Sequence, residues 1–277
     1  MASDRLSRDP IFAAAERERM RPERPFIHLR VHSAYSLLEG ALQLGKIIGQ
    51  AVKDEAPAIA VTDTNNLFGA LEFAQKATKE GLQPIVGCQL SFAFEDALSE
   101  ARRGNRKMGP QYETLVLIAA TEEGYANLVR LVSRAYLETE PGTETHIGAD
   151  WLKELNAGII CLTGGPRGPV GAALKAERPE IAEQRLLFLK ELFGNRLYVE
   201  LERLQGYDRA VEAATVDLAY RHELPLVATN EAFFLKRDDF EAHDALIAIA
   251  EGTVIAVDDR RRLTPDNYLR PQVEMAK

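Results

Sequence analysis

The chain has 277 residues, a length at which a barrel of strands and helices can form a single domain. Hydrophobic residues make up 46% of the sequence, which excludes a disordered chain. The formal net charge is −8, and this acidic balance argues against a domain that grips a nucleic-acid backbone over a wide face.

The sequence also indicates a compartment. No run approaches the ~18 consecutive apolar residues that a membrane-spanning helix needs, and the N-terminus lacks the apolar core of a signal peptide. The two cysteines, Cys88 and Cys161, lie far apart in apolar runs, as small core residues do in a reducing cytoplasm. We therefore expect a cytoplasmic protein with no membrane partner.

Two segments of the chain differ from the rest in composition. Residues 1–25 interleave acidic and basic side chains and are expected to form a flexible or weakly helical segment before a domain over residues 26–277. Residues 95–112 are polar and predict an exposed loop.

Between these segments, β-prone and helical patterns alternate. Seven short β-prone runs begin at Phe26, Ala58, Pro84, Thr114, Gly158, Arg196 and Leu224. Apolar residues spaced by three and four predict helices over 44–55, 69–80, 123–138, 179–193 and 207–222. Such alternation implies parallel strands joined by right-handed crossovers. Seven units indicate an α/β fold with a closed or nearly closed (β/α)7 barrel, and a doubly wound open sheet is the alternative.

Three polar side chains share one face of the first predicted strand. His28, Arg30 and His32 alternate along it, so all three should point the same way. Two imidazoles and a guanidinium are costly to bury unless they meet water, carboxylates or a metal. The spacing leaves two readings, a metal site and a strand end whose polar face looks into solvent or a loop.

Carboxylates follow two other predicted strands. Asp63 closes the strand from Ala58, and Glu231 follows the last strand. Catalytic side chains gather at the C-terminal strand ends of parallel barrels, although Asp and Asn also serve as turn and helix-capping residues. A barrel enzyme that uses Asp63 and Glu231 as acid and base is therefore one alternative.

A glycine-rich segment, GGPRGPVG from Gly164, lacks the spacing of either phosphate-binding motif and predicts a loop-to-helix turn. The remaining histidines, His146, His222 and His243, are isolated and are expected to be structural or solvated.

Several segments together resemble a known family. HLRVHSAYSLLEGA, VTDTNNLFGALEF, KEGLQPIVGCQ, GYANLVRLVSRAYLE, VATNEAFF and LTPDNYLR occur in the order found near the N-terminus of bacterial DNA polymerase III alpha subunits, in their PHP (polymerase and histidinol phosphatase) domain. The resemblance runs from about Phe26 to the end of the chain. It implies a distorted seven-stranded barrel, which agrees with the strand count.

The resemblance also implies where a metal site once lay. In metal-binding members, nine ligands surround a trinuclear site at the C-terminal strand ends. Their positions, with the neighbouring Asp63, fall here on Arg30, His32, Glu39, Asp63, Thr64, Gln89, Thr114, Gly165, Glu231 and Phe233. Only His32, Glu39 and Glu231 keep a ligating side chain, since arginine stays protonated and glycine and phenylalanine offer no ligand atom. We therefore expect no bound metal and no metal-dependent hydrolysis.

The family implies the biological setting. The domain would belong to a DNA-directed DNA polymerase that uses magnesium and meets DNA through the parent holoenzyme. It would pack on the polymerase body, whose carboxylates lie downstream, and dock the proofreading exonuclease subunit. An active metal-dependent PHP phosphoesterase or 3′–5′ exonuclease is the alternative.

The arginine at a lost ligand position predicts an internal cation. Glu39 and Glu231, with Asp63 nearby, would repel one another or take up protons without a counter-charge. The planar fork of Arg30 can bond two carboxylates at once. We expect it to contact Glu39, Glu231 or both.

Overall fold

The computed structural model describes residues 25–102, 112–257 and 259–276. The predicted flexible segment over residues 1–25 falls almost entirely outside these described residues. The strands are β1 (Ala58–Thr64), β2 (Gln83–Ala93), β3 (Glu113–Ala119), β4 (Ile147–Gly148), β5 (Ile159–Leu162), β6 (Leu197–Glu202) and β7 (Leu226–Thr229). The helices are α3 (Leu44–Lys53), α4 (Ala70–Lys79), α5 (Ala97–Arg102), α6 (Glu122–Glu138), α7 (Ala149–Leu155), α8 (Pro169–Lys175), α9 (Pro179–Phe193), α10 (Arg209–Arg221), α11 (Phe240–Ala250) and α12 (Gln272–Met275).

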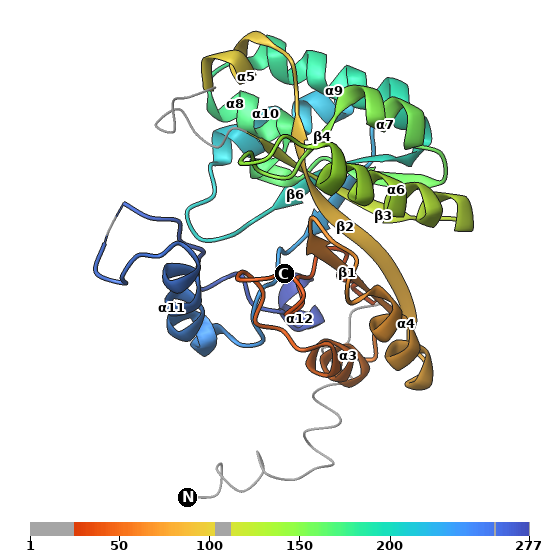
Figure 1. Cartoon of the computed structure of the whole chain (residues 1–277), viewed down its shortest axis with the longest axis vertical. Helices are drawn as coiled ribbons and strands as arrows, with labels where there is room; N and C mark the ends of the chain where they lie inside the picture. Colours follow the sequence, from red (N-terminus) through yellow and green to blue (C-terminus); the bar gives the residue numbers. More distant parts are fainter. Residues whose placement is uncertain (1–24, 103–111, 258, 277) are drawn as a thin grey trace, which may run out of the picture.

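One curled sheet organises the fold. Its strands follow the order β1-β2-β3-β5-β6-β7, and the two-residue β4 pairs with β2. Helices α6, α7, α8, α9 and α10 lie together over one part of the sheet, and α3 and α4 lie by β1 (Figure 1). The expected α/β class and curled, barrel-like sheet are confirmed, and the open doubly wound alternative is wrong.

Extended segments bring the two edges of the sheet together. The backbone of residues 28–33 follows β1, where Ala60 N donates to His28 O at 2.8 Å and Thr62 N donates to Val31 O at 2.9 Å. Its other side meets the chain that follows β7, where His32 N donates to Ala232 O at 2.8 Å. The sheet therefore curls far enough to place Arg30 and His32 between β1 and the end of β7.

Two details of the predicted sheet are wrong. The run from Phe26 forms isolated bridges rather than a regular strand, because it hydrogen-bonds its neighbours only at a few positions. Strand β3 runs antiparallel to both β2 and β5. Of the link from β2 to β3, the described part holds one helix, the six-residue α5.

The polar run over residues 95–112 is not simply an exposed loop. Its first part forms α5, which buries Leu98, Ser99 and Arg102. Residues 103–111 of this predicted loop lie outside the described residues.

Amphipathic helices cover the sheet as their spacing predicts. Helix α3 buries Leu44, Ile47, Ile48 and Ala51, which share one helical face. The largest core cluster lies among β2, β3, β5 and β6 and the helices α6, α8, α9 and α10. Cys88 and Cys161 are buried in it as free thiols, which confirms their expected place.

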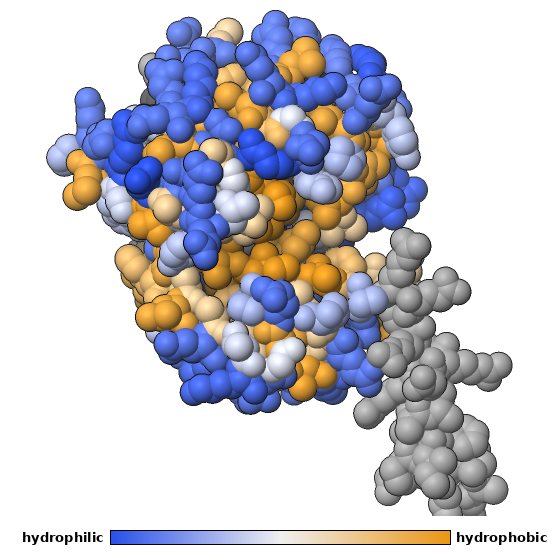
Figure 2. All heavy atoms as spheres, turned by 90° about the vertical axis from the view of Figure 1, so that its right-hand side faces the viewer, coloured by the Kyte–Doolittle hydropathy of each residue, from blue (hydrophilic) through white to orange (hydrophobic). Residues whose placement is uncertain are grey.

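The inner face of the sheet is apolar away from the C-terminal strand ends. Val116, Ile118 and Leu162 are buried there, with half-buried neighbours that include Ile85 and Tyr198. Figure 2 shows apolar atoms gathered in a hollowed band across the middle of one side of the molecule. Charged side chains inside the curled sheet are thus concentrated near one end of its strands.

The glycine-rich segment is the predicted turn into a helix. Gly164 follows β5 with φ +77°, and a Cβ at this position would lie 1.9 Å from Thr114 O. Only glycine combines that backbone angle with so close an approach. The turn continues through the short helix η2 (Gly165–Arg167) into α8. In the described part of the chain, no helix is both long and apolar enough to span a membrane.

Candidate functional site

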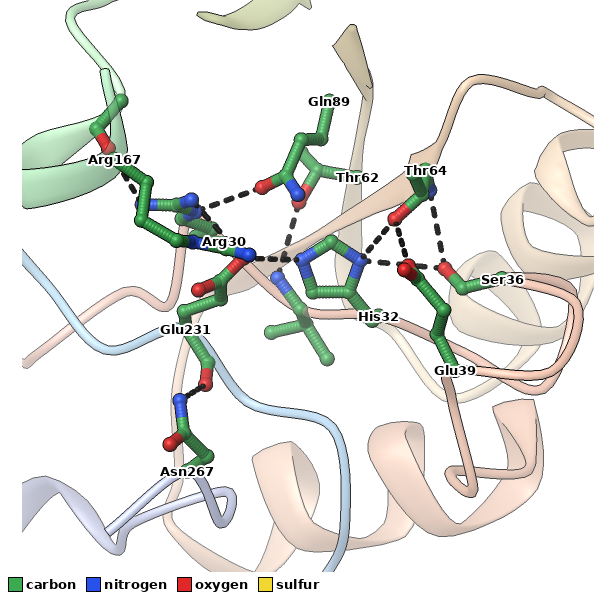
Figure 3. A network of polar contacts seen from close by, with 12 residues as sticks. Arg30, His32, Ser36, Glu39, Thr62, Thr64, Gln89, Arg167, Glu231 and Asn267 are labelled. Carbon is green, nitrogen blue, oxygen red and sulfur yellow. Dashed lines mark hydrogen bonds and ion pairs between the residues drawn. The ribbon is translucent and has the colours of Figure 1, made fainter. Parts of the chain in front are cut away.

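Polar side chains from several segments converge where β1, β6 and β7 end and where the 28–33 segment passes between them (Figure 3). We call these residues the Arg30 cluster. Its members are Arg30, His32, Ser36, Glu39, Thr64, Gln89, Arg167, Glu200, Glu202, Glu231 and Arg261. The predicted convergence of His32, Asp63 and Glu231 at one end of the barrel is confirmed, because Ser36 bonds to both His32 and Asp63, and Glu231 contacts His32.

Arg30 lies at the centre of this cluster and is fully buried. Its Nη2 donates to Glu231 Oε1 at 3.0 Å, and its Nη1 donates to Glu200 Oε1 at 3.2 Å. The remaining nitrogen, Nε, donates to Gln89 Oε1 at 3.0 Å. Burial disfavours a charged guanidinium, yet the neighbouring carboxylates outweigh that effect and raise the pKa of Arg30. The predicted contact with Glu231 is confirmed.

Glu231 has two cationic partners. Arg167, from the glycine-rich turn, reaches the same Oε1 atom that Arg30 contacts. Burial would raise the pKa of Glu231, but the charges of Arg167 and Arg30 hold it well below the usual range. Asn267 also donates to Glu231 O at 2.9 Å, which fixes the backbone.

Two further carboxylates come from the end of β6. Glu200 and Glu202 alternate along that strand, so both side chains project toward Arg30. Burial raises the pKa of Glu202 to about 7; the charge of Arg30 opposes this shift, and the carboxylates of Glu231 and Glu200 add to it. The cluster therefore holds one carboxyl group close to protonation at neutral pH.

His32 joins Arg30 to the other side of the cluster. Its Nε2 lies 3.3 Å from Glu231 Oε1, and its Nδ1 lies 3.2 Å from Thr64 Oγ1. The imidazole stacks on Phe233 with ring centroids 4.1 Å apart. A phenyl ring thus covers the face of this histidine at a position where metal-binding relatives would carry a ligand.

Glu39 does not contact Arg30, so the expected contact with Glu39, Glu231 or both is made through Glu231. Its Oε2 accepts from Thr64 Oγ1 at 2.7 Å, while Arg261 pairs with its Oε1. Burial alone would raise the pKa of Glu39, but the charge of Arg261 and the bond from Thr64 lower it. A separate arginine therefore neutralises this carboxylate.

Asp63 stabilises the loop that follows the 28–33 segment. Ser33 N donates to Asp63 Oδ1 at 2.6 Å, and Ser33 Oγ donates to Oδ2 at 2.8 Å. Ser36 Oγ adds a bond to Oδ1 at 2.7 Å. Because three donors from one loop engage this carboxylate, the geometry does not support an acid–base pair of Asp63 and Glu231.

The structure separates the other predicted positions. A Cβ on Gly165 would lie 3.6 Å from Arg30 Nη1, so this glycine borders the cluster as expected. Thr114 lies in β3 opposite Ser91 and is not one of the residues that the cluster joins. His28 points elsewhere, with Nε2 donating to Arg270 O at 2.8 Å. Arg30 and His32 are both buried, so a strand end that faces solvent is also wrong.

Sequence reasoning missed several members of the cluster. Glu200 and Glu202 had a usable signal, since two glutamates alternate at the end of a predicted strand. Arg167 is the one cationic residue in the glycine-rich turn, so the sequence indicated it. No pattern in the sequence around Arg261 indicated a role for that residue. His243 is not isolated, because its Nε2 donates to Glu39 O at 2.6 Å.

The residues present do not fit the metal site that the family resemblance implies. Guanidinium groups of Arg30, Arg167 and Arg261 pair with Glu231 and Glu39, the carboxylates at the implied ligand positions. Among the described residues, no group of three or more His, Cys, Asp or Glu side chains is arranged to hold a metal ion. The absence of metal from the protein in solution stays a prediction.

The raised pKa of Glu202 predicts an unusual pH dependence of stability. An acid with a raised pKa in the folded state binds its proton more tightly there than in the unfolded chain. Its stabilising contribution is present below the ordinary pKa of 4.5 and is lost as pH rises to about 7. Glu202→Gln mimics the neutral form, so its stability relative to the parent should rise by about 1–3 kcal/mol between pH 5 and pH 8.

Urea unfolding at both pH values measures this difference. The exposed Glu80→Gln variant serves as the matched control. A gap between Glu202→Gln and the parent that stays constant from pH 5 to pH 8 would contradict the prediction.

Comparisons with known proteins place the chain in a family. A family model of the PHP domain matches residues 28–204. DNA polymerase III subunit alpha of Caulobacter vibrioides is 41% identical over 254 residues, which are 91% of this chain and 22% of that protein. The corresponding Escherichia coli K12 subunit is 34% identical over 91% of this chain and 21% of its own length.

The chain thus spans about a fifth of the length of these curated relatives. Among solved structures, an amidohydrolase from Chromobacterium violaceum, solved with sulfate and no metal, matches 75% of this chain and 87% of its own. Its TM-score is 0.49 and its sequence identity 14%. On the family match, which covers more than half of its residues, the chain belongs to the PHP domain family and resembles the PHP region of DNA polymerase III alpha subunits.

Proposed function

We propose that this chain is the PHP domain of a replicative DNA polymerase III alpha subunit and that it is a structural module without hydrolytic activity. The polymerase part of the proposal is supported by the names and identities of the relatives. In that protein the domain would pack on the polymerase body in the cytoplasm, while magnesium-dependent DNA synthesis takes place elsewhere in the chain.

The loss of hydrolysis rests on one observation, the buried guanidinium of Arg30 bonded to Glu200 and Glu231. Hydrolysis in metal-dependent relatives requires a water molecule activated by bound cations. A permanently charged guanidinium pairs with these two carboxylates, but it offers no open coordination position and lowers no water pKa. The arginines would preserve the architecture of a metal site while removing its chemistry.

Metal content and hydrolysis test this proposal together. The purified chain should contain less than about one equivalent of zinc, manganese or iron, because three scattered ligands do not assemble a multinuclear site. It should hydrolyse neither nitrophenyl phosphate nor single-stranded DNA when manganese or zinc is added. Two or more tightly bound ions, with turnover abolished by His32→Ala, would instead favour the PHP phosphoesterase or exonuclease alternative.

Binding of the proofreading exonuclease is the second part of the proposed role and is supported by the family resemblance. We expect saturable one-to-one binding when the exonuclease subunit of the same organism is titrated into this chain and heat is measured. A full-length polymerase in which this domain has been cleanly replaced should lose that binding. Normal binding after the replacement would remove the docking role and leave the polymerase assignment intact.

A further inference from the structure

A cleft of about 850 Å³ lies away from the Arg30 cluster. Its walls come from the end of β2, the start of α5, the loop between α6 and β4, and the facing sides of α7 and α9. These elements lie together at the upper end of the molecule in Figure 1. The proposed function makes no use of this cleft.

Aromatic rings line the cleft. They are Phe94, Tyr112, His146, Trp151 and Phe188, and all are half-buried. Tyr112 and His146 stack with centroids 4.2 Å apart, and Phe94 meets Phe188 edge to face at 5.5 Å. Half-buried aromatic rings in a concave site supply large contact areas at a low cost in side-chain entropy.

The floor of the cleft is held by a buried arginine. Arg185 donates to both oxygens of Asp96, at 2.7 and 3.0 Å, and to Glu113 Oε1 at 2.8 Å. Its guanidinium also lies over the ring of Phe94, 4.7 Å from the centroid. The ring of Phe94 and the carboxylate of Asp96 are therefore fixed before any ligand binds, which reduces the entropy lost on binding.

The lining carries more acidic than basic groups. Its carboxylates are Glu95, Asp96, Glu138, Glu140 and Asp150, and its cations are Lys153 and Arg185. Neither Glu95 nor Glu140 forms an ion pair with a described residue, and both are exposed. Among the described lining residues the uncompensated charge is negative, so it would repel a nucleic-acid backbone and attract a cationic segment.

We propose that this cleft docks an extended basic peptide segment of a partner protein, with one apolar side chain against the aromatic lining and flanking lysine or arginine side chains at Glu95 and Glu140. The inference does not depend on the proposed role of the Arg30 cluster. Aromatic anchoring gives the segment its affinity, and the acidic rim selects its charge and orientation.

The fluorescence of Trp151 reports peptide binding directly, because Trp151 is the single tryptophan of the chain and lies in the cleft. The probe is the acetylated, amidated heptapeptide GKLRFKG, which contains no tryptophan, and GELEFEG is its acidic counterpart. Titrating the basic probe at low salt should change the tryptophan fluorescence saturably, with half-saturation below about 100 µM. The acidic peptide should give no saturable change.

Charge-reversal variants test whether the fluorescence change arises from binding in the cleft. Glu95→Lys with Glu140→Lys should weaken binding of the basic probe at least about tenfold, because attraction at the rim becomes repulsion. Glu80→Lys with Glu191→Lys changes the net charge equally at exposed sites outside the lining and should leave binding almost unchanged. Circular dichroism confirms that each variant is folded.

Three outcomes would overturn the proposal. The first is a tryptophan fluorescence that shows no saturable change up to about 1 mM basic probe. The second is equal weakening of binding by the two double variants. The third is tighter binding of a short oligothymidylate than of the basic peptide. None of these results bears on metal content, hydrolysis or polymerase identity, so a failure here is distinguishable from a failure of the proposed function.

Discussion

Replacing Arg30 with alanine should lower the free energy of unfolding by about 3–5 kcal/mol at neutral pH. The main cost is the negative charge that remains buried without a partner, and the lost hydrogen bonds of Arg30 contribute less. Without the guanidinium, Glu200 stays buried beside Glu202 with no cation of its own, and Glu231 keeps the half-exposed Arg167 and the neighbouring His32. Isolated buried carboxylates are unfavourable, so they would take up protons or admit water. Urea unfolding followed by circular dichroism measures the loss.

Further variants distinguish charge from packing. Arg30→Met restores much of the side-chain volume without the charge and should remain destabilised. Adding Glu200→Gln to Arg30→Met removes one of the stranded charges and should recover part of the loss. Arg203→Ala breaks a solvent-exposed pair with Glu212 and should change stability little. An Arg30→Ala protein as stable as the parent at neutral pH would show that the arginine is dispensable.

The position of the Arg30 cluster could be predicted because strand ends are readable from the sequence. Asp63 and Glu231 each follow an apolar run with clear boundaries, and C-terminal ends of strands in a curled sheet meet at one end. The family resemblance added the place of Arg30. The contact of Arg30 with Glu231 was predicted, but its bonds to Glu200 and Gln89 were not, because which further groups a long side chain reaches depends on the curl of the sheet.

Long-range partners illustrate that limit. Arg261 neutralises Glu39 across 222 positions of sequence, and nothing in the segment around Arg261 distinguishes it from its neighbouring arginines. The alternation of Glu200 and Glu202, in contrast, was visible on a predicted strand. Polar alternation on an otherwise apolar strand indicates a buried polar site as well as carboxylates at strand ends do.

Strand direction was the weakest part of the fold prediction. Periodicity identifies β3 but carries no information about which way the strand runs. Strand–helix alternation favours parallel strands, but a link of the same length can also bring the chain back to an antiparallel neighbour. The polar composition of residues 95–112 hid α5, whose buried face includes Arg102 paired with Glu113 at 2.8 Å.

The same physics predicts a second large loss of stability, at Arg185. Replacing this residue with methionine should lower the free energy of unfolding by about 3–5 kcal/mol at pH 7. Its side chain is buried in α9 and bonds Asp96, Glu113 and Ser99, so its removal breaks several charge-assisted bonds at once. Methionine fills much of the volume, so the main cost is that Asp96 loses its cation and Glu113 keeps Arg102 alone.

Acid should reduce this penalty, because protonation removes the stranded charge. Burial raises the pKa of Glu113, although the charges of Arg185 and Arg102 oppose the shift, and losing Arg185 should raise this pKa further. As pH falls, Glu113 therefore becomes neutral earlier in Arg185→Met than in the parent, and the stability gap between the two proteins narrows. Urea unfolding at pH 7 and pH 4.5 measures the gap. The exposed Arg221→Ala, which breaks the pair with Glu183, is the control and should show almost no gap at pH 7. A loss for Arg185→Met no larger than that of Arg221→Ala would mean that Asp96 and Glu113 find other partners or water, and that the floor of the cleft does not depend on this arginine.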